Sequence, residues 1–297
     1  MSADGRPGPA TEAFAAHRNL LFTVAYEMLG SAADAEDVVQ ETWLRWANID
    51  QSVVRQPRAY LVRIVTRQAL NRLRTLSRRR EDYVGEWLPE PLVTSPDVAD
   101  DLELAENVSI AMLTVLETLG PTERAVFVLR EVFDTPYDEI AETLGKTQAA
   151  VRQLAHRARE HVAARRPRMQ VSRAEQEQAV ERFMAALQSG DVDRLLAVLA
   201  PDVVLVSDGG GVVAAVRHPI EGADKVARLL SRFAVAAPGA RAHTVLLNGA
   251  PAARIDVEGV GTVAVNLAAD GGRITRIYAV ANPEKLARLD AETLLTR

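Results

Sequence analysis

The sequence predicts a multidomain protein, in which two all-α parts are followed by an α+β cone with a curved antiparallel sheet. Apolar residues recur at steps of three and four up to about residue 166, as in amphipathic helices. Strand-like runs dominate residues 242–280, after three further helical patterns. The 297 residues are enough for two or three domains with cores of their own.

Composition excludes several classes of site. The chain has no cysteine, so disulfides, thiolate metal sites and cysteine catalysis are excluded. Its five histidines lack the spacing of metal ligands, so we expect no metal and no cofactor. The first 13 residues lack the basic start and apolar run of a signal peptide, and no window approaches 18 apolar residues. We therefore expect a cytoplasmic protein that makes no membrane contact.

Three amphipathic helices are predicted before residue 80. The first covers residues 14–28 and ends at Gly30. Ser31 begins a capping-box-like start for a second helix, over residues 32–47, which has an acidic, polar face. Pro57 suits the first turn of a third helix, which is rich in arginine.

Charge is distributed in blocks, although the net charge is −5. Residues 52–80 hold nine arginines and no acid, whereas residues 81–106 hold nine acids and no base. Residues 144–168 hold seven basic residues and one acid. Solvated helix faces would explain one such block, but two basic blocks around an acidic one favour separate basic surfaces for nucleic acid.

A helix-turn-helix is predicted near residue 145. Residues 137–144 form a short amphipathic helix, Gly145 ends it, and a second helix opens near Thr147. Such a second helix fits a major groove, where Arg and Gln match base edges. The alternative is an ordinary αα-hairpin with a solvated basic face. The basic face carries Arg152, Gln153, His156, Arg157 and Arg159.

The middle of the chain predicts a linker and two more helices. Residues 81–106 have few apolar runs and are interpreted as an acidic linker with Trp87 as a local anchor. Residues 102–119 and 121–132 are expected to be helical, separated at Gly120.

The last third predicts helices followed by strands. Helices are expected at 175–187, 191–199 (ended by Pro201) and 223–233. The predicted strands are 203–206, 242–247, 252–257, 261–268 and 274–280.

The helical part resembles an extracytoplasmic-function sigma factor, a small specificity subunit of bacterial RNA polymerase. The stretch LFTVAYEMLGSAADAEDVVQETWLRW is similar to the first part of sigma region 2. The stretch PRAYLVRIVTRQALNRLRTLSRRRE is similar to the promoter-facing remainder of that region. Sigma region 4 is similar to LGPTERAVFVLREVFDTPYDEIAETLGKTQAAVRQLAHRARE. The resemblance places region 2 at residues 11–80, the linker at 81–106 and region 4 at 107–166.

The resemblance implies core RNA polymerase and promoter DNA as partners. Region 2 would bind the polymerase clamp through Asp37, Gln40, Glu41 and Trp43. It would engage the −10 element through Arg58, Tyr60, Arg63, Arg67, Asn71 and Arg74. Region 4 would read the −35 element through Thr147, Gln148, Arg152, Gln153, His156, Arg157 and Arg159. This part has no acid–base pair or nucleophile, so we expect no enzyme.

Residues 174–297 resemble the SnoaL-like or nuclear transport factor 2-like fold, and the combination resembles the sigma subgroup that carries this extension. Three signatures carry the resemblance: WLPEP at 87–91, DGGG at 208–211 and NPEKL at 282–286. Val212 stands where the subgroup usually has Lys, and Glu284 where Asp is more frequent. The resemblance implies an interdomain regulatory contact through Trp87, Pro89, Asp208, Gly209, Gly210, Gly211, Asn282, Pro283 and Glu284.

Other functions stay open at this point. The cone could hold an unidentified small ligand, as a sensor or as an enzyme with Asp208, His218, Asp256 and Asn266 as pocket groups. The chain could also be a repressor without polymerase contacts. The glycines after Asp208 lack the G-x-x-x-x-G-K spacing of a phosphate loop, so a tight turn or a close approach of another backbone is favoured.

Overall fold

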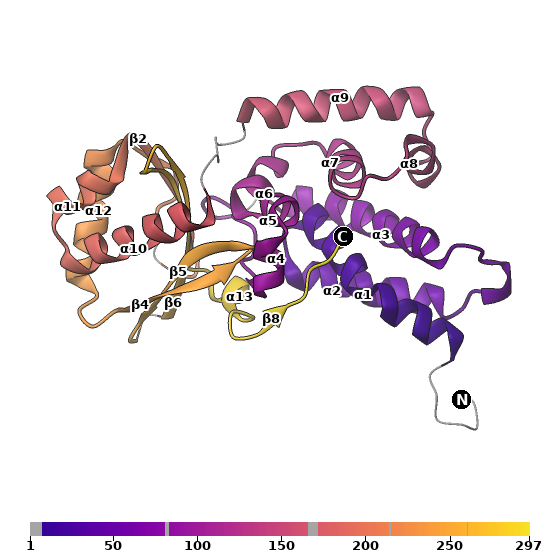
Figure 1. The fold of residues 1–297 in the computed structure, drawn as a ribbon, viewed down its shortest axis with the longest axis horizontal. Helices are drawn as coiled ribbons and strands as arrows, with labels where there is room; N and C mark the ends of the chain where they lie inside the picture. The colour runs from indigo at the N-terminus through magenta and orange to yellow at the C-terminus, as the bar shows by residue number, and fades with distance from the viewer. Residues whose placement is uncertain (1–7, 81–82, 166–171, 214, 260) are drawn as a thin grey trace. The chain divides into compact units, whose positions relative to one another are not determined.

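A computed structural model describes residues 8–80, 83–165, 172–213, 215–259 and 261–297. The chain forms two compact units (Figure 1). Unit 1 contains residues 1–81, 115–165 and 294–297, and unit 2 contains residues 82–114 and 166–293. No helix among the described residues is long and apolar enough to cross a membrane.

Unit 1 begins with the three predicted helices, α1 (Pro9–Leu29), α2 (Ala32–Trp46) and α3 (Pro57–Arg80). A short 3-10 turn, η1 (Gln51–Val53), precedes α3. Gly30 ends α1 in the left-handed region at φ 67°, as predicted. The three helices pack on one another through buried apolar side chains that include Leu21, Val24, Met28, Val38, Trp46, Leu61 and Val65.

The start of α2 has the N-cap hydrogen bond that the sequence suggested. The Ser31 hydroxyl accepts a hydrogen bond from the Asp34 N–H at 3.2 Å, which is half of the motif. The Asp34 carboxylate accepts from Arg72 on α3, at 2.7 Å. Asp34 therefore ties α2 to α3.

The second part of unit 1 contains the predicted helix-turn-helix. Helix α7 (Pro121–Phe127) continues as the π-helical turn η2 (Val128–Val132), then α8 (Tyr137–Leu144) and α9 (Gln148–Arg165) follow. Gly145 separates α8 from α9 at φ 62°. In Figure 1, α9 lies beside α7 and α8.

The segment interpreted as a linker has regular structure within unit 2. It contains β1 (Val93–Thr94) and α4 (Pro96–Asp100), and α5 (Leu102–Val108) begins inside it. The single helix predicted over 102–119 is wrong: it breaks at Ser109, which has extended ψ, and α6 (Ile110–Leu116) follows. The Ser109 hydroxyl accepts from Met112 N–H at 3.1 Å, so Ser109 caps the new helix.

An eight-stranded sheet dominates unit 2, in the order β3-β2-β7-β6-β5-β4-β1-β8. All predicted strands are present, and the pairs β2–β7 and β1–β8 are parallel whereas the others are antiparallel. The expectation that Pro201 ends a helix is wrong, since β2 already begins at Leu199. The bounds are β2 (Leu199–Asp208), β3 (Ile220–Glu221), β4 (Arg241–Leu247), β5 (Ala250–Val257), β6 (Gly261–Asp270), β7 (Arg273–Val280) and β8 (Glu292–Thr293).

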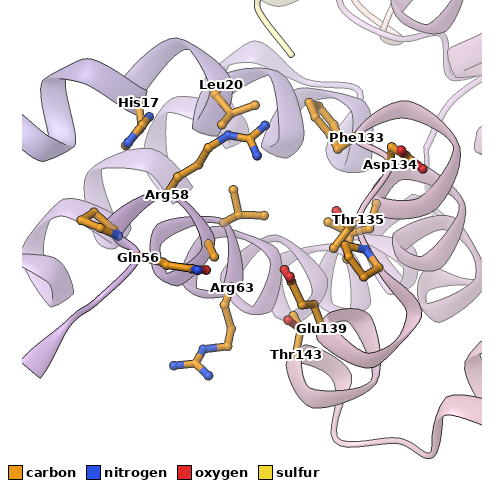
Figure 2. Close-up of a pocket in the computed structure, with 15 residues that line it drawn as sticks. His17, Leu20, Gln56, Arg58, Arg63, Phe133, Asp134, Thr135, Glu139 and Thr143 are labelled. Carbon is orange, nitrogen blue, oxygen red and sulfur yellow. The ribbon is translucent and has the colours of Figure 1, made fainter.

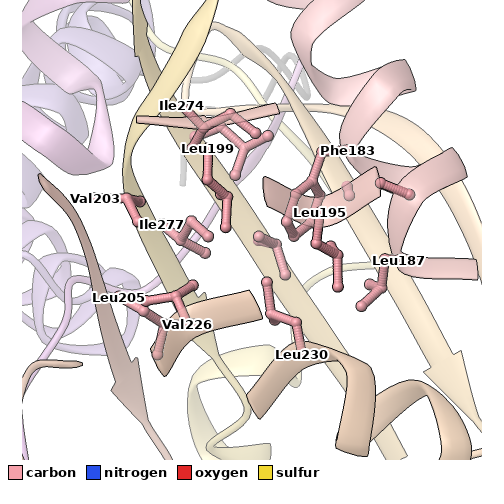
Figure 3. Close-up of a cluster of buried hydrophobic side chains, with 14 of the residues drawn as sticks. Phe183, Leu187, Leu195, Leu199, Val203, Leu205, Val226, Leu230, Ile274 and Ile277 are labelled. Carbon is pink, nitrogen blue, oxygen red and sulfur yellow. The ribbon is translucent and has the colours of Figure 1, made fainter. Parts of the chain in front are cut away.

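Three helices cover one face of this sheet. They are α10 (Arg173–Ser189), α11 (Val192–Val198) and α12 (Ala223–Ala236), and a short helix, α13 (Pro283–Leu286), follows β7. Figure 3 shows the core that they enclose, with Phe183 and Leu187 from α10 facing Leu205 and Ile277 from the strands. The predicted α+β cone is confirmed.

Candidate functional site

Helix α9 presents a polar face of the kind that fits a DNA groove. Its apolar stripe, Val151, Ala155 and Ala158, is buried against α7 and α8. The opposite face is exposed. All seven residues that the sequence singled out lie there: Thr147, Gln148, Arg152, Gln153, His156, Arg157 and Arg159.

The α9 arginines make exposed contacts within unit 1, and the guanidinium of Arg152 also lies 5.7 Å from the Tyr137 ring centroid. Arg152 donates to the Gln148 amide oxygen at 3.2 Å, one turn earlier on the same helix. Arg157 and Arg159 are 3.4 and 3.5 Å from carboxylates of Glu123 and Glu131, and both arginine side chains are about half exposed. Exposed pairs of this kind contribute roughly 0–1 kcal/mol, so the cations are available to an external anion.

Helix α3 carries the second basic surface. Arg58, Arg67, Asn71 and Arg74 are exposed on it. Tyr60 is half-buried, with its ring centroid 6.0 Å from that of Trp46. The guanidinium of Arg63 lies 4.7 Å from the Tyr60 ring centroid, which is a cation–π distance.

Two of these α3 arginines are bound by the helix-turn-helix of the same unit. Arg67 donates to the backbone carbonyls of Thr143, at 2.8 Å, and Glu142, at 3.0 Å. Arg63 forms an ion pair with the Glu142 carboxylate. Because both acceptor residues lie at the carbonyl end of α8, the helix dipole adds to the attraction. We call this the α3–α8 contact.

A cavity of about 480 Å³ lies beside the α3–α8 contact (Figure 2). His17 and Arg58 line it from α1 and α3, and Thr135 and Glu139 line it from the segment that enters α8 and from α8 itself. Partial burial and the nearby Arg58 lower the pKa of His17. Arg58 and Arg63 give one wall of the cavity positive charge, and Asp134 and Glu139 give the other wall negative charge.

The acidic face of α2 is exposed as predicted at Asp37, Gln40 and Glu41. It is fixed from α3, since Gln68 donates to the Glu41 carboxylate at 2.7 Å. Trp43 is half-buried, with its ring centroid 5.1 Å from that of Phe14. These four side chains lie on the single helix α2, which packs against α3.

Sequence reasoning missed a buried charged group in unit 1. Glu27 is fully buried, and neither of its carboxylate oxygens has a hydrogen-bond partner among the described residues. Burial raises the pKa of Glu27 to about 8, an effect that nearby Arg124 only partly offsets. Arg124 is also buried; it donates to the Glu27 backbone carbonyl at 3.0 Å and pairs with Glu117. Helical periodicity places such residues but does not reveal that their side chains enter a core.

In unit 2, the WLPEP segment lies on the sheet, on the side where Asp208 ends β2. We call residues 83–92 the linker segment. The Asp208 side chain has no exposed surface, and it accepts hydrogen bonds from the Tyr83 hydroxyl at 2.7 Å and the Leu88 N–H at 2.9 Å. Gly210 N–H donates to it at 3.0 Å. One carboxylate thus holds the linker segment at two points, and we call this cluster the linker site.

A cation that the sequence analysis did not select completes the linker site. Lys285 Nζ is 2.6 Å from the Asp208 carboxylate and also donates to the Leu88 carbonyl. The same ammonium lies 3.9 Å from the Trp87 ring centroid and 5.2 Å from that of Tyr83. A desolvated cation beside aromatic rings is worth about 2 kcal/mol or more. The NPEKL signature contained Lys285, so the signal was present in the motif but was not assigned to this residue.

The remaining signature residues lie around the Asp208–Lys285 ion pair. Pro89 is buried, and Asn282 donates to the Tyr83 hydroxyl at 3.0 Å. Asn282 also caps α13 by accepting from Glu284 N–H at 3.0 Å, and Pro283 occupies the first turn. Burial, followed by the hydrogen bond to Asp208, raises the pKa of Tyr83, which therefore stays a neutral donor.

The glycine loop forms the tight turn that the sequence predicted. Val212 and Val213 N–H groups both donate to the Gly209 carbonyl, at 3.1 and 3.0 Å. A Cβ on Gly210, at φ +64°, would lie 2.4 Å from the Asn282 amide nitrogen, and one on Gly211 would lie 3.1 Å from Val84. Close approach to Asn282 and to the linker segment requires these glycines.

We expect Gly210→Ala to destabilise unit 2 and to displace Asn282, because the added Cβ clashes and the backbone is left-handed. The expected cost is about 1–3 kcal/mol, measured by thermal unfolding. Gly239→Ala is the matched control, since Gly239 has φ +86° but no atom within 4 Å of an added Cβ. Equal losses in the two variants would contradict the close-approach argument.

A second buried anchor holds the linker segment, and the sequence analysis did not find it. Asn248 is fully buried; its side chain accepts from Leu92 N–H and donates to the Val108 carbonyl, both at 2.9 Å. Its N–H also donates to the Leu92 carbonyl at 2.8 Å. Asn248 and Gly249 both have positive φ at the β4–β5 turn. The Asn-Gly pair was a readable hairpin signal.

The four candidate pocket groups of the cone are not brought together. Asp208 is committed to the linker site, and Asp256 accepts from Thr262 at 2.6 Å and from Arg254 at 3.1 Å. His218 is exposed, and Asn266 is buried in β6. Within the described residues, no group of three or more His, Cys, Asp or Glu could hold a metal ion.

Comparisons with known proteins agree with this architecture. Models of sigma-70 region 2, sigma-70 region 4 and the SnoaL-like domain match residues 13–79, 109–162 and 180–280. The chain is 39% identical to "ECF RNA polymerase sigma factor SigJ" of Mycobacterium tuberculosis (strain ATCC 25618 / H37Rv), over 92% of this chain and 91% of that protein. It is 35% identical to "Probable ECF RNA polymerase sigma factor SigI" of the same species (strain CDC 1551 / Oshkosh), over 96% of this chain and 97% of that protein.

A solved structure shows the same fold. The crystal structure of the Mycobacterium tuberculosis extracytoplasmic function sigma factor SigJ matches with a TM-score of 0.76 and 36% identity, covering 94% of this chain and 99% of that one. The predicted resemblance is confirmed. The chain belongs to the extracytoplasmic-function (ECF) RNA polymerase sigma factors and carries a SnoaL-like domain after sigma regions 2 and 4.

Proposed function

We propose that this chain binds core RNA polymerase and directs it to specific promoters. The observation that carries the proposal is the exposed face of α9, the second helix of the helix-turn-helix, in a chain of the sigma family. Arginine and glutamine on such a face make forked hydrogen bonds to base edges. The −35 element would be read by Arg152, Gln153 and Arg157, with Thr147, Gln148, His156 and Arg159 at its sides.

The −10 element would be engaged by α3. Opened promoter DNA needs cations for phosphates and aromatic faces for unstacked bases. Arg58, Arg67 and Arg74 supply cations, Asn71 supplies an amide, and Tyr60 with Arg63 supplies a stacking surface. The exposed acidic face of α2 has the charge sign for a protein partner rather than DNA, so Asp37, Gln40, Glu41 and Trp43 would contact the polymerase.

We expect Arg152→Ala to weaken promoter binding of the reconstituted holoenzyme about tenfold or more, because a base-reading arginine contributes about 1–3 kcal/mol. The measurement is affinity for a promoter duplex selected by transcription from genomic fragments. Arg228→Ala is the control, as Arg228 is exposed on α12 of unit 2. If both variants bind like the wild type, α9 does not read this promoter.

The α3–α8 contact suggests that the free protein holds its −10 surface closed. Arg63 and Arg67 cannot serve DNA phosphates while they bind Glu142 and Thr143. We therefore propose that these two segments separate when the chain engages polymerase and DNA. The separation exposes α3 at the point where melted DNA needs it.

Glu142→Lys is expected to open this contact by placing a cation beside Arg63, and so to raise affinity for single-stranded DNA several-fold at low salt. Asp138→Lys is the matched control, because it makes the same charge change at an exposed position of α8 outside the α3–α8 contact. A gain in Glu142→Lys that does not exceed the gain in Asp138→Lys would refute the closed-surface proposal.

We further propose that the SnoaL-like domain regulates the sigma regions through the linker site. Its contact with Trp87, Leu88 and Tyr83 ties the chain between regions 2 and 4 to the sheet. A linker fixed at several points restricts how the two regions are presented to polymerase. Replacing Trp87 by Ala should change promoter output without unfolding either unit, and unchanged transcription in vitro would remove the idea.

The same residues support a regulatory domain without catalysis. Asp208 is already ion-paired to Lys285 and accepts hydrogen bonds from Tyr83 and Leu88, so its carboxylate holds the linker segment and has no exposed surface that could meet a substrate. We therefore propose a binding function for the cone rather than an enzymatic one. We also place the protein in the cytoplasm, where a polymerase specificity subunit meets the chromosome.

A further inference from the structure

The cone contains a cavity, open to solvent on one side, that neither the sigma function nor the linker site uses. Its volume is about 340 Å³, and it lies between the sheet and α10 and α12. Figure 3 shows part of its wall, where Phe183, Leu187 and Leu230 from the helices face Leu205 and Ile277 from the strands. A ligand pocket in a protein typically measures about 300–1,000 Å³, so this volume is sufficient for a small molecule.

The lining is apolar throughout except at one residue. Fourteen of the fifteen described lining residues have hydrocarbon or aromatic side chains, and the fifteenth is Ser207. The Ser207 hydroxyl accepts a hydrogen bond from Val216 N–H at 3.2 Å, and among the described residues it donates to none, so its hydrogen can be donated to a ligand. No acid, base, lysine or arginine is among these described lining residues. These lining residues therefore contain no group that could form an ion pair with a charged ligand.

Water does not suit this cavity. A buried water needs two to four polar partners, whereas this wall provides one hydroxyl, and apolar cavities of about 150 Å³ stay dry and take up benzene or xenon. Protein interiors pack closely, so a space of this size inside a core leaves many van der Waals contacts unmade. An apolar guest would restore them.

Access is available on one side of the cavity. Ala215, Val216 and Phe233 in its wall are half-buried rather than buried, in contrast to Leu205 and Ile277 at its base. The partly exposed part of the wall, which also includes Leu229, Val263 and Ala281, is where a ligand can enter.

We propose that the cone binds an uncharged, apolar small molecule in this cavity, with at most one oxygen acceptor placed against Ser207. A carboxylate or ammonium is excluded as the buried part of the ligand, because an unpaired charge in such a wall costs several kcal/mol or more. Neutral lipid-derived alcohols, aldehydes and terpenes are members of the fitting class, whereas fatty acids and phosphorylated metabolites are not.

The cavity and the linker site share two strands. Along β2, Leu205 and Ser207 face the cavity, whereas Val206 packs with Leu88 on the other face and Asp208 holds the linker segment. Along β7, Ala279 faces the cavity and Tyr278 packs with Leu88. Alternate residues of a strand point to opposite faces of the sheet. A ligand in the cavity would therefore contact the same two strands, β2 and β7, that contact the linker segment on the opposite face of the sheet. An effect of the ligand on transcription through the linker segment rests on the proposed function, but ligand binding itself does not.

The test uses the full chain and the neutral fluorescent probe 1-N-phenylnaphthylamine. We expect saturable binding of one probe per chain, displaced by decan-1-ol at least ten times more effectively than by decanoate, which has the same chain length with a charge. Absence of saturable binding would overturn the site. Equal displacement by decanoate would overturn the ligand class.

Two variants locate the site. Ala279→Leu fills the cavity from β7 and should reduce probe affinity at least tenfold, whereas Ala236→Leu, on the exposed surface of α12, should leave it unchanged. Leu229→Phe fills the cavity from the helix side and replaces Ala279→Leu if that variant fails to fold. Wild-type affinity in a folded filled variant would overturn the location.

Hydrogen exchange of residues 83–92, measured with and without decan-1-ol, tests the connection to the linker. A change at Leu88 on ligand binding supports coupling through the two strands. Unchanged exchange at saturating decan-1-ol overturns the coupling. Because this readout and the probe assay need no transcription, their failure is distinguishable from failure of the sigma function.

Discussion

Asp208→Ala is expected to release the linker segment from the cone and to change promoter output. The substitution removes the acceptor of Tyr83 and Leu88 and leaves the Lys285 ammonium, 11% exposed, without its anion. Breaking one side of a buried ion pair costs about 3–5 kcal/mol, since the remaining charge stays desolvated. Hydrogen exchange of residues 83–92 should accelerate strongly, and the amount of specific transcript should change several-fold.

Asp256→Ala is the matched control for that loss. Asp256 lies in the same unit and also pairs with a cation and a hydroxyl, those of Arg254 and Thr262, which lie outside the linker segment. It should leave exchange at residues 83–92 unchanged. Equal acceleration in both variants would mean that general loosening of unit 2, rather than release of the linker, is measured.

Glu27→Gln is expected to stabilise unit 1 at neutral pH and to leave its stability unchanged near pH 4. The folded-state pKa of Glu27 is raised from 4.5 to about 8, so the unfolded chain releases this proton at lower pH than the folded chain does. Stability therefore falls as pH rises from about 4.5 towards 8. Between about pH 4.5 and about pH 7.5 the fall is about 4 kcal/mol, at about 1.4 kcal/mol per pKa unit.

Urea unfolding measures this effect in a Trp87→Phe background, in which only Trp43 and Trp46 of unit 1 remain as tryptophan fluorophores. The chain with Glu27 should show the pH slope and the Glu27→Gln variant should lack this contribution, so the difference between them grows as the pH rises. Glu12→Gln alters an exposed carboxyl on the same helix and serves as control. A slope that persists unchanged in Glu27→Gln would contradict the burial argument.

The helices and strands were largely predictable from the sequence because their signals are local. Periodicity identified α1, α2 and α3, and Gly30 and Gly145 ended helices where left-handed backbone was required. The break at Ser109 was not predicted, since the apolar pattern continues across it and only the capping hydroxyl marks the new start. Local signals predict where helices and strands occur, but a capping side chain such as Ser109 can end one helix and begin another within a continuous apolar pattern.

The linker site was only partly predictable. The motifs named Trp87, Asp208 and Asn282, which do meet in the structure. Tyr83 lies outside the three motifs, and Lys285 lies inside NPEKL but makes its contacts with segments far apart in the sequence, so a local pattern does not reveal the role of either residue. Burial of Glu27 and Arg124 was missed for the same reason. A charged residue in a helical pattern is expected to face solvent, and only the tertiary packing of other helices shows that it is buried.

The linker segment also changes how the cone's effect should be tested. Residues 82–114 form a compact unit with residues 166–293, and β1 pairs with β4 of the cone. Removing everything after residue 170 would expose that surface as well as remove the cone. Point variants at the linker site separate the two effects.

The most direct test is transcription in vitro from a genomic promoter pool, using core RNA polymerase with the full-length chain, Asp208→Ala or Asp256→Ala. We predict promoter-specific transcripts with the full-length chain, a several-fold change with Asp208→Ala, and no change with Asp256→Ala. DNA binding without any specific transcript would contradict the sigma function and favour a repressor. Specific transcripts that are identical for all three proteins would contradict regulation through the linker site.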